Sequence, residues 1–162
     1  MTAKSMEERL CEEWGLRDAK SIRDKIFDGS SGDSTVRTLL PAKKLVVCSF
    51  ALGKLLASYE VGLKAAQLRR FYESLLNIKA AVLSIRLKPN VADLFQEKVL
   101  PEIVMLKPQL ANAKARQPKE VAPFFDVMNP MLDCVFSIED YERLCQFAEA
   151  VVAYHKYCGG RD

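Results

Sequence analysis

Apolar residues recur at intervals of three and four along most of this chain, a spacing that places them on one side of an α-helix. The clearest stretch runs from residue 137 to 160. Ser137 and Asp140 resemble a capping box at its start, and the pair Gly159-Gly160 is typical of a helix end. Its apolar stripe consists of Tyr141, Leu144, Ala148, Val151, His155 and Cys158. The pattern predicts a long helix that buries this stripe.

The same spacing predicts further helices at 42–58, 64–87, 91–99 and 102–117, and a short one around 121–128. Asn129-Pro130 predicts a turn before the last helix. The strict alternation of apolar and polar residues that is typical of strands does not occur in the sequence. We therefore expect an all-α protein, most simply a compact bundle of about five helices.

The first 36 residues differ from the rest and are expected to form an N-terminal extension. Residues 5–27 are rich in charged side chains and contain few large apolar ones, and GSSGDS at 29–34 is typical of a flexible linker. Two alternatives remain open for this segment: an amphipathic helix docked on the body, or an arm that becomes ordered only on a partner. We expect a single helical-bundle domain at 37–162.

Composition narrows the class of protein. With 162 residues, 49% of them hydrophobic, the chain can bury one sizeable core. Its five cysteines are an odd number without a CxxC pair, which argues against a zinc knuckle and against a secreted disulfide framework. The most apolar run, 45–56, is too short to span a bilayer. We expect a cytoplasmic protein with no membrane partner.

Charge is unevenly distributed along the chain. Residues 37–119 contain fifteen basic and five acidic side chains, whereas residues 120–162 contain three basic and eight acidic ones. This asymmetry favours either a polyanionic partner for the middle segment or contact between the basic and acidic faces of neighbouring copies. The simpler alternative is that Lys and Arg only solvate helix faces.

Candidate catalytic chemistry is sparse. The only imidazole is His155, and Cys158 lies three residues later on the same helix face, so a thiol dyad is conceivable. A histidine on an apolar stripe is more often a structural residue. One histidine and scattered cysteines match no metal-ligand spacing. We therefore expect no enzyme activity, no metal and no cofactor.

Polyanion binding is the stronger hypothesis, because Lys and Arg contact phosphates without reading bases. Basic residues lie off the apolar stripe of two predicted helices, and adjacent helices would combine them into one surface. The candidates are Lys64, Arg69 and Arg70 on the first helix, with Lys107, Lys114, Arg116 and Lys119 on the second. Tyr72 and Tyr154 could stack on bases, although core packing is the more common role. The pattern does not distinguish RNA from DNA or from an acidic protein.

Three segments carry a resemblance to a known family. They read QLRRFYESL at 67–75, LKPQLANAKAR at 106–116 and AEAVVAYHKYCGG at 148–160. In this order they resemble the Csm family, the small subunit of type III-A CRISPR ribonucleoprotein interference complexes. The similarity covers roughly residues 40–160. Asn112 and Lys114 stand where the family frequently has an aromatic and a small residue.

The resemblance implies a non-catalytic, five-helix structural subunit of an antiviral complex. Several copies would stack along a filament beside the backbone subunits that hold the guide RNA, and would brace the guide and target RNA through phosphate contacts. Cleavage would belong to the neighbouring backbone subunits. By motif position, Arg69, Arg70, Lys107 and Arg116 would face RNA, and Lys156 is a further candidate. The alternative from the residues alone is a helical adaptor that binds only protein.

Overall fold

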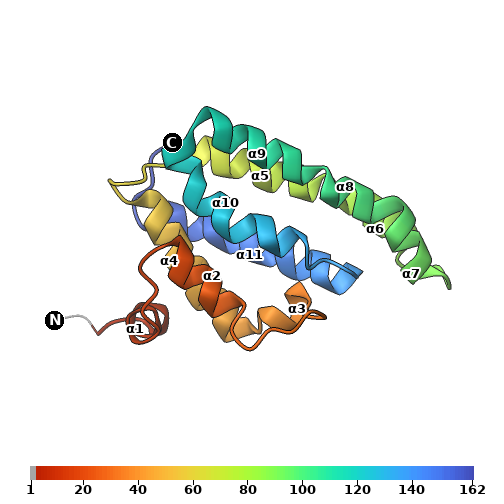
Figure 1. Cartoon of the computed structure of the whole chain (residues 1–162), viewed down its shortest axis with the longest axis horizontal. Coiled ribbons are helices and arrows are strands. Elements are labelled where there is room, and N and C mark those ends of the chain that lie inside the picture. Colours follow the sequence, from red (N-terminus) through yellow and green to blue (C-terminus); the bar gives the residue numbers. More distant parts are fainter. Residues whose placement is uncertain (1–2) are drawn as a thin grey trace.

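Helices joined by short turns make up residues 3–162, the part of the chain that the computed structural model describes, and this part contains no strand (Figure 1). The all-α prediction is therefore confirmed. The helices are α1 (Met6–Glu13), α2 (Ala19–Ile26), α3 (Val36–Leu39), α4 (Ala42–Ala57), α5 (Ala65–Leu76), α6 (Lys79–Ile85), α7 (Val91–Leu94), the π-helix η1 (Phe95–Val99), α8 (Leu100–Val104), α9 (Leu106–Arg116), α10 (Pro118–Leu132) and α11 (Ile138–Tyr157). The helical segments are more numerous than the five that we expected, because short helices extend and interrupt the long ones.

A long helical hairpin forms one side of the molecule (Figure 1). α5 and α6 run outward, and η1, α8 and α9 return along them after the turn at α7. The single helix predicted for 64–87 is divided at Asn77 and Ile78, which form a turn. On the returning side, the Leu100 amide donates to the Phe95 carbonyl five residues back, just before Pro101, which has no amide proton. The π turn therefore lies where proline disturbs the regular bonding.

α4 and α11 run side by side in the same direction through the middle of the bundle. Both helices bury long apolar stripes, and the predicted burial of the α11 stripe is confirmed at Tyr141, Leu144, Val151 and His155. Gly53 of α4 lies where the two helices approach most closely. A Cβ atom on this glycine would be 2.7 Å from Tyr154 Cβ and 2.8 Å from the His155 amide nitrogen. The absence of a side chain at Gly53 is what allows this approach.

Gly53→Ala is expected to lower the free energy of unfolding by about 2 kcal/mol. At a contact this short the overpacking cost should lie at the upper end of its usual range, about 3 kcal/mol, whereas the helix-propensity gain of alanine is about 1 kcal/mol. The contacted atoms belong to the α11 backbone and a Cβ, so they cannot rotate away. Urea denaturation measures the change. Gly32→Ala is the control, because a Cβ there meets nothing within 4 Å. Equal stability of the two variants would contradict the close approach.

The predicted turn at Asn129-Pro130 is wrong, because α10 continues through it to Leu132. Proline removes one hydrogen bond and is costly in a helix interior. At Pro130 the loss is a single bond, the one that an amide at this position would donate to the Asp126 carbonyl. The segment also buries Met128, Met131 and Leu132. Burial of these large side chains outweighs the missing bond.

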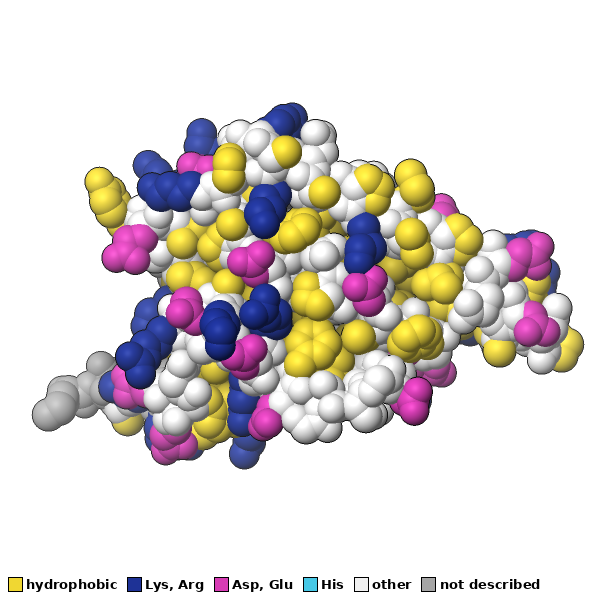
Figure 2. Space-filling model, viewed as in Figure 1, with side chains coloured by type: hydrophobic (Ala, Val, Ile, Leu, Met, Phe, Trp, Pro, Cys, Tyr) yellow, Lys and Arg dark blue, Asp and Glu magenta, His cyan; other side chains and the backbone are white. Residues whose placement is uncertain are grey.

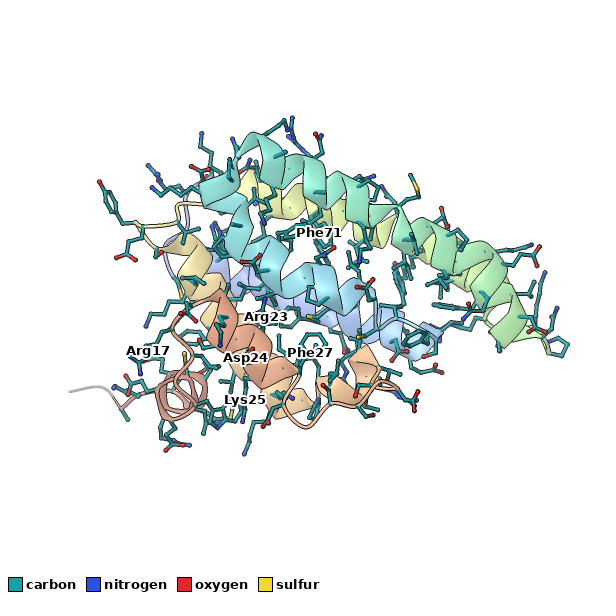
Figure 3. The ribbon with its side chains drawn as sticks, viewed as in Figure 1. Arg17, Arg23, Asp24, Lys25, Phe27 and Phe71 are labelled. Atoms are coloured by element: carbon teal, nitrogen blue, oxygen red, sulfur yellow. The ribbon has the colours of Figure 1, made fainter. Side chains whose placement is uncertain are left out.

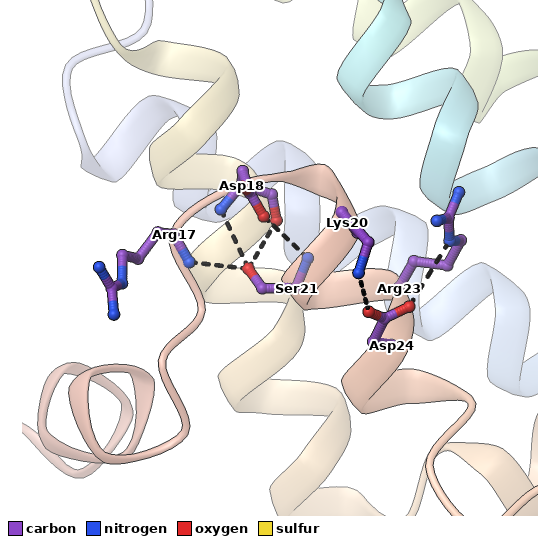
Figure 4. A network of polar contacts seen from close by, with 6 residues as sticks. All are labelled: Arg17, Asp18, Lys20, Ser21, Arg23 and Asp24. Carbon is purple, nitrogen blue, oxygen red and sulfur yellow. Dashed lines mark hydrogen bonds and ion pairs between the residues drawn. The ribbon is translucent and has the colours of Figure 1, made fainter.

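Residues 5–27 form two helices that pack on the body, as in the first of the two alternatives. α1 packs on α4, and α2 packs on α4 and α10, with Ile22 and Ile26 fully buried. A capping box begins α2: the Ser21 amide donates to Asp18 at 2.8 Å, and Ser21 Oγ accepts from the Asp18 amide at 3.1 Å (Figure 4). The GSSGDS segment at 29–34 makes turns between α2 and α3. Its flexibility and the domain boundary at residue 36 stay predictions.

Tyr154 attaches α1 to α11 by donating a hydrogen bond from its hydroxyl to Glu7 Oε2, 2.9 Å away. Burial and this carboxylate raise the pKa of Tyr154 to about 12. The hydroxyls of Ser5 and Tyr154 lower the pKa of Glu7 below its usual 4.5. Since the folded pKa is the lower one, this stabilisation is complete above pH 4.5 and is lost as the pH falls through the folded value.

Tyr154→Phe is expected to loosen α1 at neutral pH and to have little effect in acid, where Glu7 is protonated in the wild type as well. Trp14, the only tryptophan, follows α1 directly and lies 4.3 Å beneath the Lys25 ammonium. Its fluorescence therefore reports on this region, and quenching by acrylamide should be stronger in the variant at pH 7 than in the wild type. A difference that persists below the folded pKa of Glu7 would contradict the assigned bond.

Asp140 joins the start of α11 to α3. Its carboxylate, 1% exposed, accepts hydrogen bonds from the Arg37 amide at 2.9 Å, the Phe136 amide at 3.0 Å and the Ser137 hydroxyl at 3.1 Å. The predicted Ser137 cap is confirmed, since Ser137 Oγ accepts from the Asp140 amide at 3.2 Å. The bond to Arg37 crosses 103 positions of the chain. Asp140 therefore has a tertiary role in addition to its place in the first helical turn.

Candidate nucleic-acid interface

The two helices that carry most of the predicted basic residues, α5 and α9, lie next to each other. α5 places Leu68, Phe71 and Leu75 in the core, so the residues between them face outward or toward α9. The first turn of α5 is held by the chain terminus, because the Ala65 amide donates to the Arg161 carbonyl at 2.7 Å. The predicted condition for one combined surface, adjacency of the two helices, is met.

A pocket of about 250 Å³ opens between α5 and α9, with the start of α10 at its base. Apolar side chains form the floor. Among them, Phe71 and Phe124 pack edge to face with ring centroids 5.2 Å apart, and Phe71 is seen between the ribbons of α9 and α10 in Figure 3. The polar lining residues are Gln67, Arg70, Ser74, Gln109, Asn112 and Arg116. The pocket thus combines an apolar floor with a hydrogen-bonding and cationic rim.

Arg70 and Arg116 are the two predicted phosphate-binding residues that the structure brings to this pocket. Arg70 comes from α5 and Arg116 from the last turn of α9, and both are exposed. Among residues 3–162, no carboxylate forms an ion pair with either guanidinium. A guanidinium presents several N–H donors in a planar fork that matches a phosphate. The pair is therefore free to bind an anion.

Lys107 and Lys114 face the opposite side of α9, toward α10. Lys107 forms an ion pair with Asp133, and Lys114 lies 3.9 Å from Asp126 and 4.4 Å from the centre of the Phe125 ring. Figure 2 shows Lys and Arg side chains beside Asp and Glu side chains on this face. The α10 carboxylates partly neutralise both ammonium groups, so the two lysines contribute less to an anion site than the arginines.

The other predicted residues are exposed but lie outside the pocket lining. Lys64 is the N-cap of α5, and Arg69 lies beside Arg70 on the same helix. Lys119 is in the first turn of α10, and Lys156 is in the last turn of α11. Of the two suggested stacking residues, Tyr72 is half-buried against the core, and Tyr154 packs edge to face on Phe50 with centroids 5.3 Å apart. The four basic residues remain predictions as RNA contacts.

Uncharged polar residues of the interface were missed by sequence reasoning. A second hollow continues from the pocket along the hairpin and shares Ser74 and Gln109 with it. The residues that line the combined groove follow helical spacing on both sides. On one side they are Gln67, Arg70 and Ser74 of α5 with its C-cap Asn77, and on the other Glu102 of α8, its C-cap Met105, and Gln109, Asn112 and Arg116 of α9. This second stripe, polar except for Met105, is a signal in the sequence, but only its basic members were predicted as site residues.

His155 has a structural role. It is 1% exposed, and its Nε2 donates to the Leu63 carbonyl at 2.6 Å. Gly160 lies against the imidazole so closely that a Cβ would come within 2.1 Å of the ring. Burial raises the pKa of the Cys158 thiol, which disfavours the nucleophilic thiolate. The conceivable His155-Cys158 dyad therefore has neither an accessible base nor an activated nucleophile.

No group of three or more His, Cys, Asp or Glu in residues 3–162 could hold a metal ion. None of the helices in this range has both the length and the hydropathy needed to cross a bilayer.

Comparison with known proteins places these helices in a family. The family model described as Csm2 Type III-A matches residues 40–161. The chain belongs to the Csm2 Type III-A family. No curated protein and no solved structure matches it. The resemblance noted from the three segments is thereby confirmed.

Membership in the Csm2 family makes the chain a subunit of a type III-A CRISPR complex, an antiviral ribonucleoprotein. It also implies assembly with the other subunits of that complex. The second of the three segments, 106–116, coincides with α9, and the first, 67–75, lies within α5. Helices α1, α2 and α3 precede the matched region.

Proposed function

We propose that this Csm2 family subunit is a non-catalytic scaffold that binds RNA through backbone phosphates along the groove between α5 and α9. Its partners are the guide and target RNA, the backbone subunits of the complex and neighbouring copies of itself, and it acts in the cytoplasm. The guide supplies sequence specificity by base pairing, so the subunit needs only electrostatic contacts. The buried His155 and the protonated Cys158 support the absence of catalysis.

The observation that carries this proposal is the convergence of Arg70 and Arg116, without ion pairs to carboxylates of residues 3–162, on one groove. They come from different helices, 46 positions apart, and each lies in a segment typical of the family. A groove flanked by two such cations attracts a polyanion and holds its phosphates by charge-assisted hydrogen bonds.

Stacking of copies is the second part of the proposal and rests on the charge asymmetry. Residues 37–119 have a net charge of +10 and residues 120–162 a net charge of −5. α11, in the acidic part, exposes Glu139 and Glu149, whereas α5 exposes Arg69 and Arg70. Opposite net charges on different segments of one chain favour contact between copies and set their orientation.

Fluorescence anisotropy with two unrelated single-stranded RNAs tests RNA binding. We expect similar affinity for both sequences and a linear fall of log K with log salt, with a slope of about −0.7 for each phosphate contacted. The adaptor hypothesis predicts no binding of RNA at low salt and co-purification with protein partners only. The absence of binding at low salt would contradict the proposal.

A further inference from the structure

We propose that the pocket between α5 and α9 binds one unpaired base of a single-stranded RNA, while Arg70 and Arg116 hold the phosphates on either side of it. This inference rests on the proposed RNA-binding function and deepens it. Phosphate binding alone needs cations on a surface, whereas this site also has a pocket that both arginines line.

The cavity has the size of a small ligand rather than of a solvent gap. Its volume of about 250 Å³ is many times the roughly 10–15 Å³ that one water molecule needs. The floor, where Phe71 and Phe124 meet edge to face, is apolar and offers no partners to ordered water. A flat heteroaromatic ring can replace this water and cover the apolar floor, to which the largely buried rings of Phe71 and Phe124 contribute small exposed areas.

The hydrogen-bonding groups of the rim are complementary to those of a neutral heterocycle. Gln67, Gln109 and Asn112 each present a carbonyl acceptor and an amide donor, and Ser74 presents a hydroxyl. None of these four side chains is hydrogen-bonded to another group within residues 3–162, so all four can bond to a ligand. Asn and Gln pair with base edges, adenine N6 and N7 above all, through the same combination of donor and acceptor.

Charge complementarity favours a nucleotide over an acidic peptide. A glutamate side chain in the pocket would place its carboxylate against uncharged carboxamides, and the two arginines at the rim would compensate it only in part. In a nucleotide, by contrast, the neutral base and the charged phosphate are separate groups, as the carboxamides and the arginines are in the site. Its neutral base matches the carboxamide rim, and its phosphates match Arg70 and Arg116. Unpaired bases, exposed on all edges, are the usual targets of protein recognition in RNA.

Comparison of an RNA with an abasic strand separates the base pocket from phosphate binding. The full chain is titrated with a single-stranded RNA and with an oligomer of the same length and charge that has no bases. We expect the intact RNA to bind about tenfold more tightly, which is the lower range for burying one base. Equal affinity for the two strands would overturn the base pocket but leave phosphate binding intact. Failure of both to bind would overturn the proposed function itself.

Variants then test whether the pocket causes the tighter binding of the intact RNA. Gln109→Leu with Asn112→Leu removes two rim carboxamides without a change in charge, and Ala113→Leu fills the pocket from α9. Both variants should bind the two strands equally, with the abasic affinity unchanged. The control Gln96→Leu with Gln146→Leu replaces two exposed carboxamides outside the groove and should keep the preference. If the rim and filling variants also keep it, the base binds elsewhere and the proposal is wrong.

A competitor tests the alternative occupant of the groove. A glutamate-rich peptide with the charge of the RNA should displace it only weakly from the wild-type protein. The inference would be overturned if the peptide displaced the labelled RNA at lower concentrations than unlabelled RNA does, and if the Ala113→Leu variant no longer showed this displacement. The pocket would then belong to an acidic protein segment.

Discussion

Replacing Arg70 and Arg116 together by alanine is expected to weaken binding of single-stranded RNA by about 30-fold at low salt. The estimate takes about 1 kcal/mol for each exposed phosphate contact, and 1.4 kcal/mol corresponds to a factor of ten. The slope of log K against log salt should become shallower by about 1.4, because two phosphate contacts are lost. Anisotropy measured over a range of salt concentrations gives both quantities.

The control for this variant removes the same charge at the far end of the hairpin. Lys88 and Lys98 are exposed beside α7 and lie outside the groove. Alanine at both positions should reduce affinity only through the general loss of positive charge. Lys107→Ala with Lys114→Ala should also have a smaller effect, since Asp133 and Asp126 already pair with these lysines. Equal losses in all three double variants would show diffuse attraction and contradict a defined site.

Asp140→Ala is expected to lower the free energy of unfolding by about 3–5 kcal/mol. The carboxylate is buried and accepts three hydrogen bonds, from Arg37, Phe136 and Ser137. Its removal leaves two backbone amides without an acceptor, and each such buried donor costs about 1–3 kcal/mol. For a chain of this length, the melting temperature should fall by about 10 °C. Thermal unfolding followed by circular dichroism measures the change.

Two further substitutions test whether the buried hydrogen bonds cause the loss of stability in Asp140→Ala. Asp140→Asn keeps one acceptor oxygen and replaces the other by a donor, so its stability should be intermediate. Glu139→Ala removes the neighbouring carboxylate, which is exposed and interacts mainly with the helix dipole, at a cost below about 1 kcal/mol. If Glu139→Ala were as destabilising as Asp140→Ala, charge at the start of α11 and not the buried bonds would be responsible.

The sequence was most informative about features that depend on interactions between residues close together in the chain. Helical spacing predicted α4, α9 and α11, and it placed His155 on the buried stripe of α11. The hydroxyl of Ser137 marked the start of α11 correctly, because a cap bonds to an amide only three residues away. Such features depend on neighbours within one or two helical turns, so a single stretch of chain contains the information.

Local rules failed where a distant contact competes with them. The rule that proline ends a helix predicted a turn at Pro130, but burial of Met131 and Leu132 against the rest of the core keeps α10 helical. One helix was predicted for 64–87, and nothing in its periodicity indicated the turn at Asn77 and Ile78. Packing on other helices decides both outcomes, and its partners are far away in sequence.

For the candidate site, too, some properties follow from the sequence and others only from the tertiary structure. Composition and charge of the sequence alone determined that the middle of the chain is basic, and three segments determined its family. Only the tertiary structure separated the cations, since it pairs Lys107 and Lys114 with α10 and brings Arg70 and Arg116 to one pocket. The physical reason is that a side chain's charge is a local property, whereas its neutralisation and the cavity beside it depend on distances between helices that no local pattern encodes.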